Sequence, residues 1–459
     1  MLTFLSWAMI IVFMYLIMTK KLSPFTALVA VPFVFALIGA FFNLYADQAI
    51  KILKVTDPTI WDQIRVLGTF TVDGVKKTST TGIMLLFAIL YFSIMLNAGM
   101  FDPITRGMIR FAKGDPLRIL IATGIVAAAV SLNGDGTTTT LIVCTAFIPL
   151  YKKLDMKLMN LAVVTVLMNT IMNLLPWGGP TARVISVLPE LNGKDAEILR
   201  LLAPGMVVAF LYMMGVCVIL GKRERKRIGI REFTEAELVE LTTSHNEEDL
   251  ALKRPKLFWF NLVLTIAIVA MLMAGTFPSV FLFVAGTVLA LMVNYPKLKD
   301  QKARIQDNAG DALQVVILVF AAGIFSGLFT STGMSDALAN SLVYLIPKSL
   351  GRFWGLVVAV LSAPGTFFLS NDAFYYGVLP VFANTGAVYG FTAMQLGIAS
   401  LLGQAFHLLS PLVAFIYLLI NLTGVDMGEW QREAGKWAIG IFISFVGVAA
   451  IIGAVPLFL

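Results

Sequence analysis

The stretch SLNGDGTTTT, residues 131–140, places an acid, two glycines and four consecutive threonines inside an otherwise apolar part of the chain. Glycines this close together interrupt a helix, because they favour turns over regular helical backbone. Asp135 is the only charged residue between Arg118 and Lys152. The role of this isolated acid depends on the environment that the rest of the chain builds around it.

Composition identifies that environment as a lipid bilayer. Of the 459 residues, 58% are hydrophobic and 13% are charged, whereas soluble proteins carry roughly 25% charged residues. Apolar runs near 20 residues recur along the chain and are long enough to cross a bilayer as helices. The sequence therefore predicts an all-α polytopic membrane protein. The formal charge of +7 comes from bases in loops, which indicates membrane orientation and no nucleic-acid partner.

A charged linker at residues 221–256 divides the chain into an N-terminal part, 1–220, and a C-terminal part, 257–459. We expect five spans and one broken segment in each part. The expected spans are residues 3–19, 25–43, 80–100, 158–188, 201–220, 257–275, 279–293, 312–331, 395–421 and 437–457, with broken segments at 118–150 and 353–383.

Basic residues predict the sidedness of the protein. They cluster at residues 20–21, 106–118, 152–157 and in the linker, which share one side if each broken segment returns where it entered. By the positive-inside rule this side is the cytoplasm, and the loop Lys297–Arg304 falls there too. Both termini are then expected outside the plasma membrane. Residues 44–79 are expected to form a long external loop containing an amphipathic helix.

An internal repeat relates the two parts. FAILYFS at 87–93 matches FAAGIFS at 320–326, and GMFD at 99–102 matches GMSD at 333–336. NLLPW at 173–177 and HLLSP at 407–411 stand 234 residues apart, the same offset as the GM pair. An odd number of crossings in each part requires the two repeats to be inverted relative to each other. Inverted repeats with broken helices are the architecture of secondary transporters.

The broken segments are too short for two full spans, so we interpret them as re-entrant hairpins whose tips meet near the membrane midplane. Non-helical backbone at that depth persists only where protein or water satisfies it. Asp135 and Asp372 would converge there, and an acid in a membrane costs at least about 2.5 kcal/mol and indicates function. Capping of a half-helix is the structural alternative for each acid. The neighbouring candidates for binding are Asn133, Gly136, Thr137, Thr138, Ser370 and Asn371.

Two further motifs interrupt helices. NLLPWGGPTAR, residues 173–183, supplies Gly178, Gly179, Thr181 and Arg183. Arg183 suits a carboxylate as a two-pronged donor, or alternatively reaches the outer interface at a helix end.

HLLSPL, residues 407–412, supplies His407 and Ser410. A histidine changes charge near neutral pH, so His407 is a candidate proton carrier, with a hydrogen-bonded structural role as the alternative.

Charge restricts the substrate. Helix N-termini and hydroxyls favour a carboxylate, yet two aspartates repel a bare polyanion. A carboxylate that arrives with a cation removes this conflict, and that cation is Na⁺, H⁺ or a chelated divalent ion. No nucleotide loop, nucleophile elbow or zinc motif is present, which argues against a pump and against the common enzyme classes.

The three quoted motifs, with FLSNDAFYYGVLP at 368–380 and GVDMGEWQ at 424–431, resemble the signature stretches of the family of citrate–Mg²⁺ and citrate–Ca²⁺ proton symporters within the ion transporter superfamily. The resemblance covers most of the chain from about residue 80. It implies proton-driven uptake of citrate as a divalent-metal complex, with Mg²⁺ or Ca²⁺ as part of the substrate and no permanently bound cofactor. Asn133 stands where the family has an acid, and the loop at 44–79 is longer than the family leads us to expect.

The resemblance assigns roles to named residues. Asp135 and Asp372 are expected to contact the metal, and His407, Asp135 and Asp372 are candidates for proton coupling. A Na⁺-coupled di- or tricarboxylate symporter or an ion exchanger on the same fold is the alternative function. The inverted repeat with its paired broken segments argues against a receptor. Saturable, gradient-driven accumulation would exclude a passive channel, and a membrane enzyme that uses Asp135 and Asp372 in acid–base chemistry is a further alternative. A homodimer is expected by analogy with relatives on this fold.

Overall fold

The computed structural model of the chain describes residues 1–231, 233, 251–345 and 348–459. Regular structure in these residues is entirely helical, and they contain no strand. This confirms the predicted all-α class. Part of the predicted linker, residues 232 and 234–250, lies outside the described residues.

The first part of the chain begins with two helices, a short connecting helix and a long helix. The following helices lead through the first break to a second long helix. Their bounds are α1 (Leu2–Met18), α2 (Pro24–Phe41), α3 (Ala46–Leu53), α4 (Ile60–Asn97), α5 (Asp102–Ala112), α6 (Pro116–Val130), α7 (Gly136–Lys153), α8 (Leu158–Met172), α9 (Gly179–Val187) and α10 (Asp195–Ile228).

The second part repeats this order after the linker. Its helices are α13 (Phe258–Ala274), α14 (Ser279–Asn294), α15 (Leu298–Ser331), α16 (Met334–Leu345), α17 (Lys348–Gly351), α18 (Trp354–Phe368), α19 (Leu379–Val388), α20 (Ala393–Leu401), α21 (Gln404–His407), α22 (Ala414–Thr423) and α23 (Met427–Ile451). The long helices α4 and α15 correspond, the broken pair α6–α7 corresponds to α18–α19, and α10 corresponds to α23.

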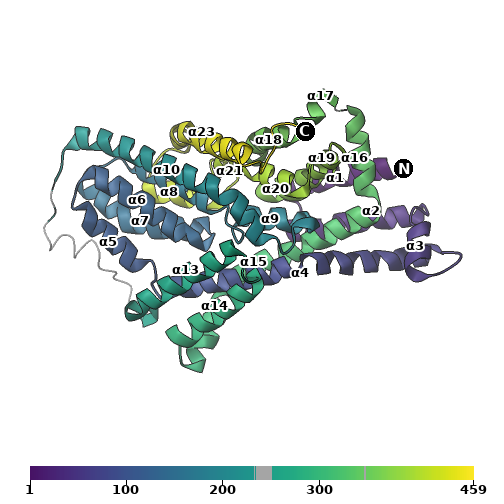
Figure 1. Ribbon diagram of the computed structural model, residues 1–459, viewed down its shortest axis with the longest axis horizontal. Coiled ribbons are helices and arrows are strands. Elements are labelled where there is room, and N and C mark those ends of the chain that lie inside the picture. Colours follow the sequence, from purple (N-terminus) through teal and green to yellow (C-terminus); the bar gives the residue numbers. More distant parts are fainter. Residues whose placement is uncertain (232, 234–250, 346–347) are drawn as a thin grey trace.

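Corresponding helices of the two parts pack against each other in opposite directions. Helices α4 and α15 cross along the middle of the molecule (Figure 1). Gly82 of α4 lies against Phe320, whereas Gly74, two turns earlier, lies against Gly323 and Gly327. An antiparallel meeting of equivalent helices is what an inverted repeat requires.

The α4–α15 crossing depends on glycine. A Cβ atom on Gly74 would lie 2.1 Å from the carbonyl oxygen of Gly323, and one on Gly327 would lie 2.4 Å from that of Phe70. Small residues let two helical backbones approach this closely within a membrane. The two repeats are therefore held together at backbone contact.

The prediction of an external loop at residues 44–79 is wrong. Helix α3 accounts for the expected amphipathic segment, but α4 begins at Ile60, where Thr59 and Asp62 form a reciprocal N-terminal cap. The charged residues of this stretch, including Arg65, Asp73 and Lys76, lie on the exposed face of a continuous helix. The loop predicted at Lys297–Arg304 is likewise the start of α15.

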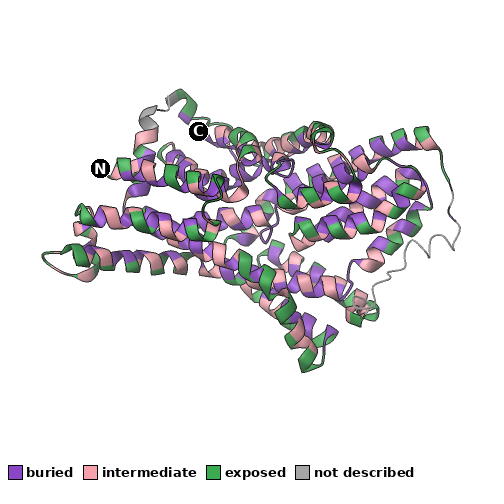
Figure 2. Ribbon diagram, turned by 180° about the vertical axis from the view of Figure 1, so that it is seen from behind, coloured by how far each residue is buried: buried purple, intermediate pink, exposed green. Residues whose placement is uncertain are grey.

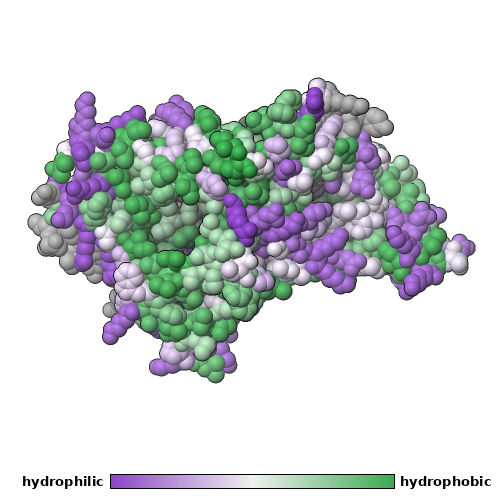
Figure 3. Space-filling model, viewed as in Figure 1, coloured by the Kyte–Doolittle hydropathy of each residue, from purple (hydrophilic) through white to green (hydrophobic). Residues whose placement is uncertain are grey.

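The surface is that of a membrane protein. Seven helices in the described residues are long and apolar enough to cross a membrane: α2, α4, α6 with the turn after it, α10, α13 with the turn before it, α15 and α23. Five shorter apolar helices, α1, α8, α14, α18 and α22, accompany them. Large apolar side chains such as Trp259, 72% exposed, and Leu211, 62% exposed, point outward. Figure 2 shows exposed residues along outward helix faces, and Figure 3 shows hydrophobic residues over much of one side.

Ion pairs join the ends of several helices at the end of the molecule beside the linker. Arg225 of α10 pairs with Asp115 at the start of α6, and Arg227 contacts Asp155 before α8. Lys253 pairs with Asp102 at 2.6 Å. Three of the segments that the basic pattern assigned to one side, residues 106–118, residues 152–157 and the linker, are joined by these ion pairs. Figure 1 shows both chain termini away from this end.

Glycine contact at the crossing predicts a position-specific effect. We expect Gly74→Leu to lower the melting temperature of the purified protein, because overpacking costs about 1–3 kcal/mol even where neighbours can shift. Gly68→Leu on the same helix is the matched control, since a Cβ there meets no atom within 4 Å. Equal melting temperatures for the two variants in a thermal unfolding assay would contradict the close crossing.

Candidate functional site

The first helix break is a capped turn. After α6 the chain makes one short 3₁₀ turn, Ser131–Asn133, and Gly134 adopts a left-handed φ of +79°. Asp135 then caps α7, because its carboxylate accepts the backbone N–H groups of Thr137 at 3.3 Å and Thr138 at 2.6 Å. Asn133 accepts the N–H of Asp135 at 2.8 Å. Aspartate and asparagine are favoured at such positions because they satisfy amide groups that the helix leaves free.

One interrupted motif, and the helix that follows the other, pack against this first break. Trp177 donates its indole N–H to the carbonyl of Leu132 at 2.8 Å. Gly136 lies under the ring of Phe415, which would be 2.3 Å from a Cβ added there. The break thus sits between residues 173–178 and the start of α22.

The second break has a different form. Helix α18 ends at Phe368, Leu369 is extended, and the chain re-enters helix through a π-helical segment, Ala373–Val378. The Ser370 hydroxyl accepts the N–H of Ala373 at 3.2 Å. Asn371 accepts a hydrogen bond from the side-chain amide of Gln404 at 3.1 Å. Unlike Asp135, the carboxylate of Asp372 caps no helix.

Arg183 forms an ion pair with Asp372. Its Nε donates to the carboxylate at 2.8 Å, and one Nη1–H donates to the carbonyl of Gly179 at 2.9 Å. The two side chains are 23% and 18% exposed, so the pair is accessible from one side. A guanidinium carries five N–H donors, and three of Arg183's have no partner among the described residues. Arg183 can therefore bind a further carboxylate without releasing Asp372.

The interrupted motifs are closed by their own polar groups. The Thr181 hydroxyl donates to the carbonyl of Leu174 at 2.8 Å. Gly178 is confined by the carbonyl of Asn173, which would lie 2.0 Å from an added Cβ, and Gly179 donates its N–H to the Asn173 side chain at 3.3 Å. The glycines therefore do more than interrupt the helix. Gly178 is also needed for packing, because a side chain there would collide with the carbonyl of Asn173.

The second interrupted motif is similarly held. The imidazole Nδ1 of His407 lies 2.7 Å from the carbonyl oxygen of Thr366, so it carries the proton and donates it. His407 is 5% exposed, and Ser410 is fully buried and accepts the N–H of Leu412. His407 therefore links α21 to α18, the helix that leads into the second break.

The structure links the predicted residues through residues 173–183. Trp177 contacts the first break and Arg183 contacts the second, so the two breaks share one connecting motif. Asp135 and Asp372 themselves share no hydrogen bond in the described part of the chain. The two acids also differ in charge environment: Asp372 is neutralised by Arg183, whereas Asp135 is exposed and has no ion pair among the described residues.

Asn169 and Gln404 border the breaks and were not predicted. Asn169 donates to Ser131 at 3.1 Å beside the first break, as Gln404 does to Asn371 beside the second. They stand 404 − 169 = 235 positions apart, within one residue of the repeat offset. Each is almost completely buried, and the amide oxygen of each lacks a partner among the described residues. A search for pairs of amides within one residue of the repeat offset would have identified them.

The described residues contain no group of three His, Cys, Asp or Glu side chains able to hold a metal ion. Of the two acids at the helix breaks, Asp135 is the one whose carboxylate forms no ion pair with the described residues. A divalent ion bound here would keep most of its oxygen ligands from the molecule that brings it, or from water.

Comparison with known proteins places the chain among transporters. The family described as citrate transporter matches residues 13–403. A citrate transporter of Bacillus subtilis (strain 168) is 46% identical over 455 residues, which cover 99% of this chain and all of the relative. A Mg(2+)/citrate complex secondary transporter of the same organism is 39% identical over 458 residues, covering both chains fully.

A solved structure shares the fold. The YdaH transporter of Alcanivorax borkumensis, described as having an unusual topology, superposes with a TM-score of 0.58 at 14% identity. The match covers 93% of this chain and all of that chain. At this identity the likeness concerns the fold alone.

The Arg183–Asp372 pair predicts energetic coupling between two distant segments. Arg183→Gln and Asp372→Asn should each lower the melting temperature, because each leaves one charge without its partner. The double variant should be less destabilised than the sum of the two, with a coupling energy of about 0.5–3 kcal/mol. Additive effects in this thermal double-mutant cycle would show that the two side chains do not interact.

Proposed function

The chain belongs to the citrate transporter family, and we propose that it takes up citrate together with a divalent metal ion, coupled to protons. Membership in this family makes it a multi-pass membrane transport protein and not an enzyme. The name of the Mg(2+)/citrate relative supports a metal complex as the substrate. One observation carries the proposal: equivalent helix breaks hold two acids, of which one is neutralised and the other is not.

Asp135 is the proposed contact for the metal of the complex. Its carboxylate is exposed and is oriented by the Thr137 and Thr138 amides. A citrate trianion with one divalent ion still carries a negative charge, so the carboxylate groups need a cationic or amide partner elsewhere. The remaining three donors of Arg183 supply it.

Asp372 is the proposed site of proton coupling. Protonation of its carboxylate would weaken the ion pair and leave the guanidinium to the substrate. This step uses a single group, placed where the second hairpin meets α9. Asp372 is then a second metal contact only in a state where Arg183 has moved away.

The other predicted residues complete the proposed site. They line the two breaks and the two interrupted motifs: Asn133, Gly136, Thr137, Thr138, Gly178, Gly179, Thr181, Ser370, Asn371, His407 and Ser410. The proposed organisation has an N-terminal repeat, 1–220, a C-terminal repeat, 257–459, and hairpins at 118–150 and 353–383. In this proposal the basic end of the molecule faces the cytoplasm, and both termini lie outside the plasma membrane. The protein assembles as a homodimer. Alternating access would move the hairpins against the outer helices.

The metal contact is tested by uptake into proteoliposomes. We expect labelled citrate to accumulate under an inward proton gradient when Mg²⁺ or Ca²⁺ is present, and accumulation to stop on addition of EDTA. Asp135→Asn should reduce uptake at least tenfold while protein yield and melting temperature stay unchanged. Asp57→Asn, a similar change in the exposed loop before α4, is the control. Normal uptake by Asp135→Asn would remove Asp135 from the site.

Ion replacement separates the coupling alternatives. If Na⁺ is replaced by choline and uptake persists, protons suffice as the driving ion. If uptake is lost, the chain is a Na⁺-coupled carboxylate symporter, and proton coupling fails as the sole drive.

The role of His407 is tested by the pH profile of uptake. A proton carrier at this position would make His407→Gln shift or abolish the pH dependence. The hydrogen bond to Thr366 leads us to expect instead a lower maximal rate with an unchanged profile, because the change weakens the link between α21 and α18. A shifted profile with full expression would assign His407 to the proton path.

A further inference from the structure

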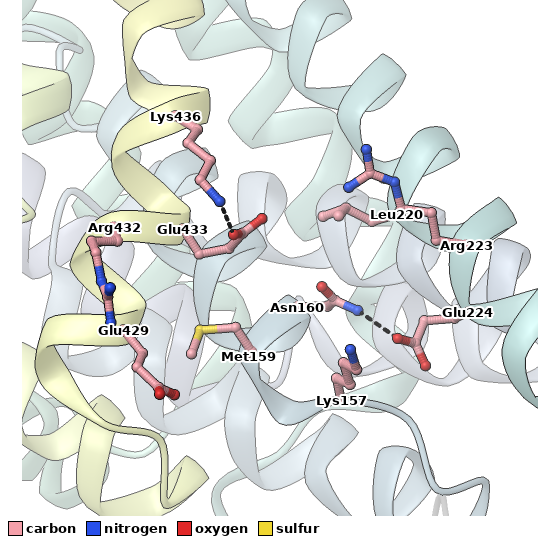
Figure 4. Close-up of a pocket in the computed structure, with 10 residues that line it drawn as sticks. All are labelled: Lys157, Met159, Asn160, Leu220, Arg223, Glu224, Glu429, Arg432, Glu433 and Lys436. Carbon is pink, nitrogen blue, oxygen red and sulfur yellow. Dashed lines mark hydrogen bonds and ion pairs between the residues drawn. The ribbon is translucent and has the colours of Figure 1, made fainter.

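A cavity lies apart from the helix breaks, at the basic end of the molecule. It has a volume of about 670 Å³ and opens between the start of α8, the end of α10 and the start of α23. Figure 4 shows charged side chains from all three helices surrounding it. A neighbouring cavity of about 530 Å³ shares Lys157 and Glu429 with it and adds one cation, Lys152, and two acids, Asp155 and Asp426.

Charge in the main cavity is unbalanced. Glu433 is paired with Lys436 at 2.6 Å, and Glu224 is paired with Arg227 at 2.7 Å. Three cations remain without an ion pair among the described residues: Lys157, Arg223 and Arg432. Glu429 is the single acid of the lining without an ion pair. The residues that line the cavity include four cations and three acids, so the lining carries an excess of one positive charge.

The floor of the cavity is preformed. Asn160 donates to Glu224 at 3.1 Å, and both residues are largely buried, 7% and 3% exposed. Arg227 holds the other carboxylate oxygen of Glu224 and also contacts the carbonyl of Asp155. Because this network fixes the acid of the floor, the unpaired cations above it are free to bind a ligand.

The helices beyond the cavity present apolar side chains. Helices α10 and α23 pack antiparallel, with Gly205 against Phe445 and Gly440 against Tyr212. Ile219, one turn before Arg223, is 43% exposed, and Ile439, three residues after Lys436, is 50% exposed. The surface therefore changes from cationic to apolar along the same two helices.

We propose that this cavity binds the phosphate headgroup of an anionic phospholipid, with the acyl chains along α10 and α23. Basic pockets between helices on the cytoplasmic side suit such headgroups, and that leaflet is negatively charged. Lys157, Arg223 and Arg432 would contact the phosphate, while the apolar faces favour a lipid over free phosphate. The site is separate from the proposed transport site and does not depend on its substrate.

Binding is tested on the purified full-length protein by thermal unfolding in detergent with added lipid. Phosphatidylglycerol should raise the melting temperature, and phosphatidylcholine and inorganic phosphate should not. The double variant Arg223→Gln/Arg432→Gln should need roughly 30-fold more phosphatidylglycerol for the same shift, because each cation contributes roughly fivefold in affinity. Arg65→Gln/Lys76→Gln on the exposed face of α4 changes the net charge equally and is the control.

Each outcome decides the assignment. An equal shift with inorganic phosphate would overturn the lipid in favour of a free anion. An unchanged response of the Arg223/Arg432 variant, or an equal loss in the α4 control, would overturn the cavity as the site. If the double variant does not fold, Lys157→Gln alone should still weaken the phosphatidylglycerol response by roughly fivefold, and a full response would reject the proposal.

Discussion

Backbone hydrogen bonding is the constraint on which this structure depends. A helix broken inside a membrane leaves N–H and C=O groups that lipid cannot satisfy. Here Asp135 satisfies two amides of α7, Trp177 satisfies the Leu132 carbonyl, and His407 satisfies that of Thr366. The polar motifs therefore have a structural role, because their side chains satisfy backbone groups that the breaks would otherwise leave without a partner.

The two repeats use this constraint differently. At the first break Asp135 caps a helix and forms no ion pair among the described residues. At the second break Asp372 forms an ion pair with Arg183. The position that corresponds to Arg183 is 183 + 234 = 417, a tyrosine whose hydroxyl donates to the carbonyl of Pro411. A symmetric scaffold thus carries an asymmetric charge pattern, which suits a substrate with both a metal ion and carboxylates.

Much of the fold was predictable because its signals are local. Apolar runs locate the helices, glycine and proline locate the breaks, and a fixed offset locates the repeat. The long helices α4 and α15 extend beyond the predicted apolar spans, because a helix also continues through charged residues such as Arg65, Asp73 and Lys76, which lie on an exposed face. Hydrophobic periodicity alone does not distinguish the exposed first half of a helix such as α4 from a connecting loop. The Thr59–Asp62 cap is the sequence signal that marks where this helix begins.

The site was predictable by residue type but not by partner. The sequence identifies Asp135, Asp372 and Arg183 as unusual in a membrane, yet only the three-dimensional arrangement shows that Arg183 contacts one acid and not the other. Asn169 and Gln404 carry no charge and stand inside apolar helices, so composition gives no signal for them. Their importance follows from burial beside the breaks, which depends on packing between distant segments.

The glycine crossing of α4 and α15 also bears on how the two halves could diverge. Consider an ancestor of half the length that assembled as a pair, with the two copies of one helix packed antiparallel. Each copy would contribute the same surface, so every substitution would enter the interface twice. Joining the halves in one chain removes this duplication, and each copy then changes alone. An arginine that contacts one hairpin and, at the corresponding position, an exposed tyrosine is a difference that a pair of identical halves could not encode.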